Sequence, residues 1–63
     1  MKYVVYANEK SDVESDIIYI CTCDTEKMAN TVSDALKHRD TGGRCDDSGI
    51  YNYYVVKKED WIV

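Results

Sequence analysis

The chain has 63 residues, a formal net charge of −4 and 44% hydrophobic residues. This length predicts a single domain, residues 1–63, near the lower size limit for folding without a disulfide, a metal ion or a partner subunit. Asp and Glu outnumber Lys and Arg by twelve to eight, and the basic residues form no cluster, which disfavours direct binding to nucleic acid because phosphates are bound by clustered Lys and Arg.

The first part of the chain predicts two β-strands joined by a hairpin loop. Residues 2–7, KYVVYA, are β-branched and aromatic without a helical period, which is typical of a strand. Residues 16–23, DIIYICTC, predict a second strand whose apolar run indicates that both of its faces are at least partly covered. The segment between them, residues 8–16, is almost wholly polar and carries the acidic side chains Glu9, Asp12, Glu14 and Asp16.

A helix is predicted after the second strand. Asp24 is the expected N-cap, because its carboxylate can accept hydrogen bonds from the free amides of the first turn. The two consecutive glycines Gly42 and Gly43 are expected to end the helix, since glycine readily adopts the left-handed conformation of a helix C-terminus. The apolar stripe of an amphipathic helix is predicted at Met28, Val32, Ala35 and Leu36.

The third strand is predicted at residues 50–58, after a turn-rich connection. Strand, strand, helix, strand is therefore the expected order, an α+β domain of ββαβ type. A right-handed crossover through the helix directs the third strand parallel to the second. If the third strand lies beside the first, the sheet is antiparallel in the order 2-1-3; the alternative order, 1-2-3, pairs strands 2 and 3 in parallel.

One helix can cover only one face of a three-stranded sheet, and side chains alternate between the two faces. We expect the helix-covered face to carry Val5, Ile18, Ile20, Ile50, Tyr54 and Val56. The opposite face is expected to carry Val4, Tyr6, Ile17, Tyr19, Cys21, Tyr51, Tyr53 and Val55. In a solitary monomer with one wet face this second set would be polar, and it is not.

The tyrosine-rich composition, six tyrosines and no phenylalanine, indicates a surface that is wet in one state and buried in another. Tyrosine combines a large apolar ring with a hydroxyl that tolerates water, and it is enriched in protein interfaces. Three occupants of this face stay open: the terminal segment Trp61-Ile62-Val63 folding back over it, a second copy of the chain, or a different protein. The expected partner-binding residues are Tyr6, Tyr19, Tyr51, Tyr53 and Trp61.

No catalytic, cofactor or metal site is predicted. Cys21, Cys23, His38 and Cys45 have the side chains of a structural zinc site, but the predicted helix, at 1.5 Å per residue, separates the first pair from the second. A redox role for Cys21 and Cys23 is the other thiol alternative, against which packing in the interior is favoured. No set of nucleophile, base and orienting group is recognisable, so we expect no enzyme.

The acidic hairpin loop allows a second function. Acidic side chains along a rim can imitate a phosphate backbone and occupy a DNA- or RNA-binding protein, with electrostatic steering of the encounter. A net charge of −4 over 63 residues is mild for such mimicry, so a solvated loop is favoured over nucleic-acid mimicry. Binding that weakens strongly with salt would indicate mimicry.

A reducing, cytoplasmic location without membrane insertion is expected. No run approaches the roughly 20 apolar residues of a membrane span, and the first apolar stretch is too short for a signal peptide. Three cysteines do not make a closed disulfide framework, which favours a reducing compartment.

Three segments, MKYVVYA, CDTEKMANTVSDALK and YNYYVV, carry a resemblance to a class of proteins. The chain resembles the very small accessory proteins encoded by bacteriophages of Gram-positive bacteria. The resemblance implies a protein that binds and blocks a host enzyme, a defence component or a protein of nucleic-acid metabolism, and it assigns no functional residues. The expected function is therefore a non-enzymatic protein-binding module that modulates or inhibits a host protein; a homodimeric structural protein is a further alternative.

Overall fold

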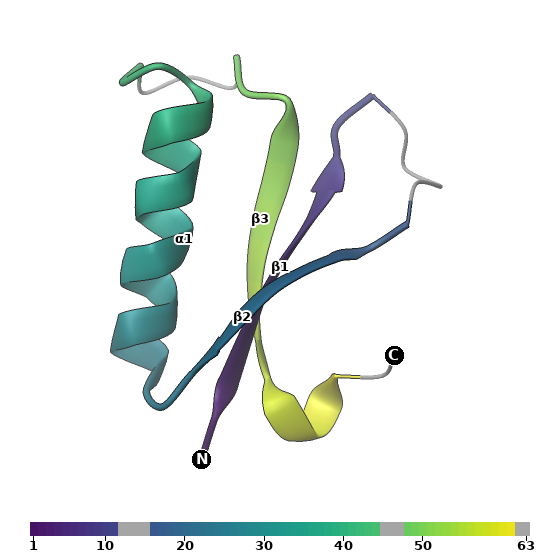
Figure 1. Cartoon of the computed structure of the whole chain (residues 1–63), viewed down its shortest axis with the longest axis vertical. Coiled ribbons are helices and arrows are strands. Elements are labelled where there is room, and N and C mark those ends of the chain that lie inside the picture. The colour runs from purple at the N-terminus through teal and green to yellow at the C-terminus, as the bar shows by residue number, and fades with distance from the viewer. Residues whose placement is uncertain (12–15, 45–47, 62–63) are drawn as a thin grey trace.

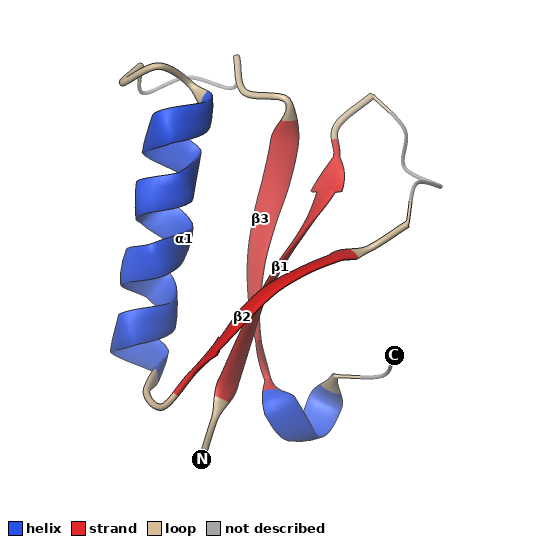
Figure 2. Cartoon of the chain, in the orientation of Figure 1, coloured by secondary structure: helices blue, strands red, loops and turns tan. Residues whose placement is uncertain are grey.

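The structure, a computed structural model, describes residues 1–11, 16–44 and 48–61. Its elements are three strands, a helix and a short 3₁₀ helix (Figure 1): β1 (Tyr3–Glu9), β2 (Ile18–Cys23), α1 (Glu26–Asp40), β3 (Tyr51–Lys57) and η1 (Lys58–Asp60). The strands form one antiparallel sheet in the order β2-β1-β3, with α1 packed on one side of it (Figure 2). The predicted ββαβ class and strand order are confirmed, and the order 1-2-3 was wrong.

The start of α1 differs from the prediction by one residue. Thr25, not Asp24, is the N-cap, and its Oγ1 accepts a hydrogen bond from the Met28 amide at 3.1 Å. Asp24 instead forms an ion pair with Lys2, with 3.0 Å between Nζ and Oδ1. Two adjacent residues of cap-forming type made this position ambiguous in the sequence.

The end of α1 is where the two glycines predicted it. The helix is capped by Thr41, and Gly42 and Gly43 both have positive φ angles, 67° and 88°. The Gly43 amide donates to the carbonyl of His38 at 2.8 Å and the Gly42 amide to that of Arg39 at 3.2 Å. This pair of bonds is a Schellman motif, which satisfies carbonyls that the helix leaves without a partner.

The helix presents a different stripe to the sheet from the predicted one. Ala29 is fully buried, whereas Met28 is 53% exposed and Ala35 is also exposed. Val32 and Leu36 pack against the core as expected. An alanine thus lies at the fully buried position of α1.

The register of the sheet decides which side chains face α1. Across β1 and β3, Val5 lies opposite Val55 and Ala7 opposite Tyr53, and both Val5 and Val55 belong to the core beneath the helix. The predicted facing of β3 was therefore wrong: the helix side carries Tyr51, Tyr53 and Val55, and the other side carries Tyr54 and Val56.

A β-bulge explains a further correction in β2. Val5 pairs with Cys21 but the next residue, Tyr6, pairs with Tyr19, so Ile20 is an extra residue in β2. Because of this insertion Cys21 faces α1 together with Ile20, and its predicted place on the opposite face was wrong. Ile17 and Ile50 were predicted to lie on opposite faces of the sheet. In the structure they lie just before β2 and β3, respectively, and both are exposed.

The main core lies between α1 and the sheet around Val5, Cys23 and Ala29. The other side of the sheet is not uniformly wet. Val4, which alternation places opposite the helix, is only 1% exposed. A second layer of side chains therefore covers part of that side.

Candidate partner-binding surface

Three tyrosines form one row across all three strands, on the side of the sheet opposite α1. The sheet register places Tyr6 directly opposite Tyr19 of β2 and directly opposite Tyr54 of β3. The rings of Tyr6 and Tyr54 are stacked, with centroids 5.1 Å apart. We call Tyr19, Tyr6 and Tyr54 the tyrosine row.

Trp61 lies against the tyrosine row. The 3₁₀ helix η1 turns the chain after β3, held by hydrogen bonds from the Lys58 amide to the Lys2 carbonyl (2.9 Å) and from the Trp61 amide to the Lys58 carbonyl (3.1 Å). The indole is 5.0 Å from the ring of Tyr6 and 6.2 Å from that of Tyr19, centroid to centroid. We call the tyrosine row together with Trp61 the aromatic surface.

Trp61 therefore covers the middle of the row, and the ends of the row remain open. Tyr6 and Trp61 are half-buried, whereas Tyr19 is 54% and Tyr54 is 41% exposed. Of the three occupants left open for this side, the C-terminal segment covers part of it through Trp61; Ile62 and Val63 lie outside the described residues. The result is a small aromatic layer with two accessible tyrosines at its rim.

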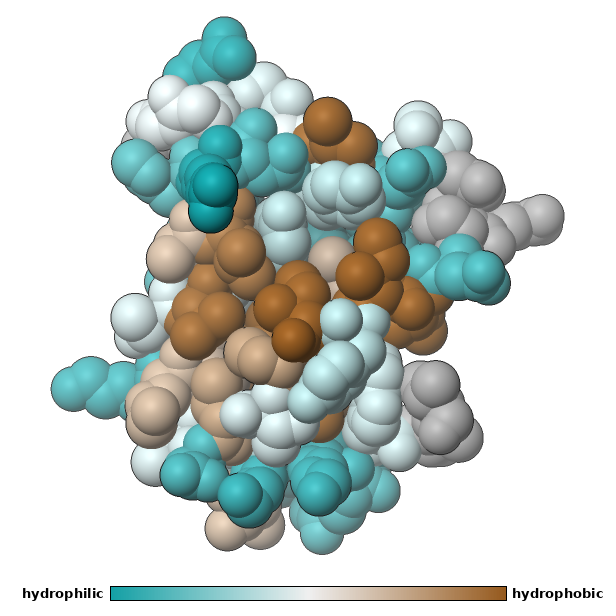
Figure 3. All heavy atoms as spheres, viewed as in Figure 1, coloured by the Kyte–Doolittle hydropathy of each residue, from teal (hydrophilic) through white to brown (hydrophobic). Residues whose placement is uncertain are grey.

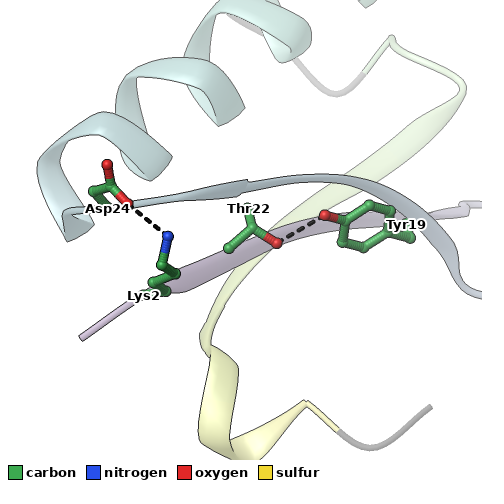
Figure 4. Close-up of polar contacts among 4 residues, drawn as sticks. All are labelled: Lys2, Tyr19, Thr22 and Asp24. Carbon is green, nitrogen blue, oxygen red and sulfur yellow. Dashed lines mark hydrogen bonds and ion pairs between the residues drawn. The ribbon is translucent and has the colours of Figure 1, made fainter.

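Polar contacts beside the aromatic surface hold its β2 end in place (Figure 4). The hydroxyls of Tyr19 and Thr22 are 2.7 Å apart, which orients the exposed phenol along the strand. Near the end of β2, the ion pair of Lys2 and Asp24 ties the N-terminal residues to the start of α1. Tyr19 is thus presented in one orientation at the free edge of the sheet.

Tyr51 and Tyr53, two of the predicted partner-binding residues, lie on the opposite side. Their rings are 6.3 Å apart, and they line an open cleft of about 220 Å³ under the C-terminal half of α1. Burial, with the nearby carboxylate of Asp40 and the hydroxyl of Tyr51 as smaller causes, raises the pKa of Tyr53 above its ordinary value. These two tyrosines belong to the packing between helix and sheet.

Tyr54 was missed as a site residue. In the segment YNYYVV, tyrosine and valine occur at both odd and even positions, so alternation alone does not assign a face. The single polar residue, Asn52, shares the side of Tyr54 and pairs with Asn8. That asparagine was the one signal in the sequence for the side away from the helix.

The predicted acidic residues are not gathered by the described part of the structure. Glu9 is the last residue of β1, and Asp16 is exposed just before β2. Asp12 and Glu14 lie outside the described residues. Their role in nucleic-acid mimicry stays a prediction.

The two cysteines of β2 lie side by side in the packing beneath α1. Both are free thiols, and their Sγ atoms are 3.9 Å apart. Burial raises the pKa of the Cys21 thiol, and the hydrogen bond to Cys23 adds to the effect, which lowers the fraction of reactive thiolate. Within residues 1–11, 16–44 and 48–61, no three His, Cys, Asp or Glu side chains come together as metal ligands would.

Comparison of the chain with protein-family models, with curated proteins and with solved structures found no match. In the part of the chain that the structure describes, no helix has both the length and the apolar character of a membrane span. The residues of the aromatic surface are accordingly interpreted from their geometry alone.

Proposed function

We propose that this protein is a non-enzymatic binding module that modulates another protein by docking the aromatic surface onto it. The observation that carries the proposal is the open tyrosine row: Tyr19 and Tyr54 are 54% and 41% exposed beside a tryptophan that already shields the middle. Aromatic residues with a polar tip are enriched at interfaces because they bury a large ring and keep a hydroxyl bonded.

The partner that we propose is a folded protein, of the kind that the resemblance to small bacteriophage proteins implies. Rigid aromatic side chains make effective anchors, because few rotamers are lost on binding and the ring fills a pocket. The net charge of −4 favours a basic rim around that pocket, through steering of the encounter.

The proposal predicts that capture of a partner depends on the ends of the tyrosine row. The double variant Tyr19→Ser/Tyr54→Ser should reduce capture of the partner from a Gram-positive lysate by at least about tenfold, the loss expected from one or two interface anchors. The matched control is Met28→Ser/Ile50→Ser, which changes two side chains of similar exposure outside the aromatic surface.

Circular dichroism of both variants separates loss of binding from loss of folding. Capture that is equal for the two folded double variants would contradict the aromatic surface as the docking site. Repeating the capture at low and at high salt tests the acidic alternative, because mimicry of a phosphate backbone depends on charges that salt screens.

A further inference from the structure

The sheet has two edge strands, β2 and β3, and they differ in how they are protected. At the start of β3, the Tyr51 amide donates to Oδ2 of Asp40 at 3.0 Å, so the end of α1 covers that edge. β3 also ends in Lys57 and is followed by Lys58, and lysines on an edge strand discourage pairing with another chain.

β2 has none of these features. From Ile17 to Cys23 it contains no charged residue and no proline, and among the described residues no strand pairs with its outer side. Ile17 is 53% and Ile18 is 44% exposed. An uncharged apolar edge with free backbone groups is a template for another strand.

Exposed apolar side chains lie at this same edge, among them Ile17 and Ile18. In the view of Figure 1, β2 lies in front of β1 and β3, so the observer looks onto the β2 edge. Seen from that side in Figure 3, the hydrophobic colouring forms a band from α1 across β2. The helix makes more of its contacts with β3 than with β2, and the exposed Ile18 lines the cleft together with Ile20 and Leu36.

We propose that β2 pairs antiparallel with β2 of a second copy of this chain, which gives a dimer with one six-stranded sheet. A two-fold axis perpendicular to the sheet matches the free donors and acceptors of the strand with those of its copy, so the edge is self-complementary. The same axis keeps both helices on one side of the sheet and brings the two clefts together over the new strand pair.

The charges that flank β2 favour this arrangement over a parallel one. One end of the strand carries Asp16, and the other carries the ion pair of Lys2 with Asp24. Antiparallel pairing places Asp16 of each copy toward the neutral ion pair of Lys2 with Asp24 in the other, whereas a parallel pair would bring the two Asp16 carboxylates together. Like charges that lie directly opposite one another destabilise a strand pair.

The bulge at Ile20 adds to the apolar contact. A bulge commonly twists an edge away from pairing, but here it turns both Ile20 and Cys21 to the helix side. The segments before and after it, Ile18–Tyr19 and Cys21–Cys23, remain extended. A facing strand can pair on both sides of the extra residue and cover it.

The dimer deepens the proposed function, and this consequence rests on it. In the dimer the two tyrosine rows lie on the same side of the shared sheet, away from the helices. Two aromatic surfaces in one rigid body can engage a dimeric partner at both of its sites, which raises the overall affinity without a new contact.

The mass in solution tests the inference. The purified wild-type chain should have twice the 7.3 kDa of one copy, and Ile18→Lys, which places a charge on the β2 edge, should halve that mass. The matched control, Ile50→Lys, changes another exposed isoleucine, just before β3, and should remain dimeric. A monomeric wild type at high concentration overturns the proposal, as does a dimer that Ile18→Lys leaves intact.

Hydrogen exchange of the wild type gives a second readout if Ile18→Lys fails to fold. Amides of β2 should be protected in concentrated protein and lose that additional protection on dilution, while amides of β3 do not change. Equal protection of β2 at both concentrations overturns the dimer. A different result would contradict the proposed function: Tyr19→Ser/Tyr54→Ser would capture as much partner as the wild type. The two failures are therefore distinguishable.

Discussion

The six tyrosines of the chain divide equally between the two sides of the sheet, and their surroundings give them different roles. By the sheet register, Tyr3, Tyr51 and Tyr53 share the side of α1, whereas Tyr6, Tyr19 and Tyr54 form the tyrosine row. A side chain with an apolar ring and a polar tip suits both a shallow core and an open surface. The same residue type therefore packs the helix on one side and is available for docking on the other.

Tyr53 makes the stability of the fold decrease with pH in the alkaline range. Burial raises its pKa above the ordinary value of 10.0, so the folded chain holds the phenol proton more tightly than the unfolded chain does. The contribution is fully present below pH 10 and is lost as pH rises through the higher pKa of the folded state. Urea unfolding of the wild type and of Tyr53→Phe should show the wild type losing stability relative to the variant above pH 10.

The carboxylate of Asp40 provides the control for that measurement. Its charge is one of the causes of the raised pKa of Tyr53, and Asp40→Asn keeps an oxygen for the Tyr51 amide while removing the charge. In the Asp40→Asn background, the difference in the free energy of unfolding between the chains with Tyr53 and with Tyr53→Phe should become smaller above pH 10. A wild type and a Tyr53→Phe variant with parallel pH profiles would contradict the burial of the phenol.

At the scale of single elements, the cap of α1 is a measurable part of the stability. Thr25→Ala removes the acceptor of the Met28 amide and should lower the free energy of unfolding by about 1 kcal/mol, as N-cap substitutions do. The comparison variant is Asp24→Ala, which should cost less because its ion pair with Lys2 is exposed to solvent and surface pairs contribute little. A larger loss for Asp24→Ala, measured by chemical denaturation, would mean that Asp24 is the cap.

The elements themselves were predictable because each has a local signal. The polar loop after Glu9, the cap residues near Thr25 and the glycine pair after α1 separate stretches of different period. The side on which a residue lies was less predictable, since it depends on the register between strands. Ile20 is an extra residue only relative to β1, and a bulge of this kind leaves no trace in the alternation of apolar residues within β2.

The buried face of the helix was also only partly predictable, because it depends on how the helix packs against the sheet. Met28 and Ala29 are neighbours, and hydrophobicity alone favours the larger residue as the buried one. In the structure Ala29 occupies the fully buried position and Met28 is exposed. The tyrosines show this limit too: Tyr6 and Tyr19 lie together with Trp61, whereas the register places Tyr54 on their side of the sheet and Tyr51 and Tyr53 on the side of α1. Whether these residues bind a partner stays a prediction.

For the whole molecule, a single helix over three strands leaves two apolar regions that the described residues do not fully cover. One is the aromatic surface, where Trp61 covers only the centre of the row. The other is the β2 edge with the cleft beside it. A chain of 63 residues buries a smaller share of its surface on folding than a larger domain does, so the binding of other chains at these regions would also stabilise the fold.

Trp61 connects stability and binding, and its removal distinguishes the two. Trp61→Ala takes a half-buried indole from the rings of Tyr6 and Tyr19 and should lower the free energy of unfolding by about 2 kcal/mol, less than the 3–5 kcal/mol typical of a fully buried tryptophan. Chemical denaturation followed by circular dichroism measures the loss, because the variant has no other tryptophan to report by fluorescence. Trp61→Phe is the control and should recover most of the stability, since the ring contact is kept. Unchanged stability in Trp61→Ala would mean that the indole does not cover the row in solution and acts, if at all, in contact with a partner.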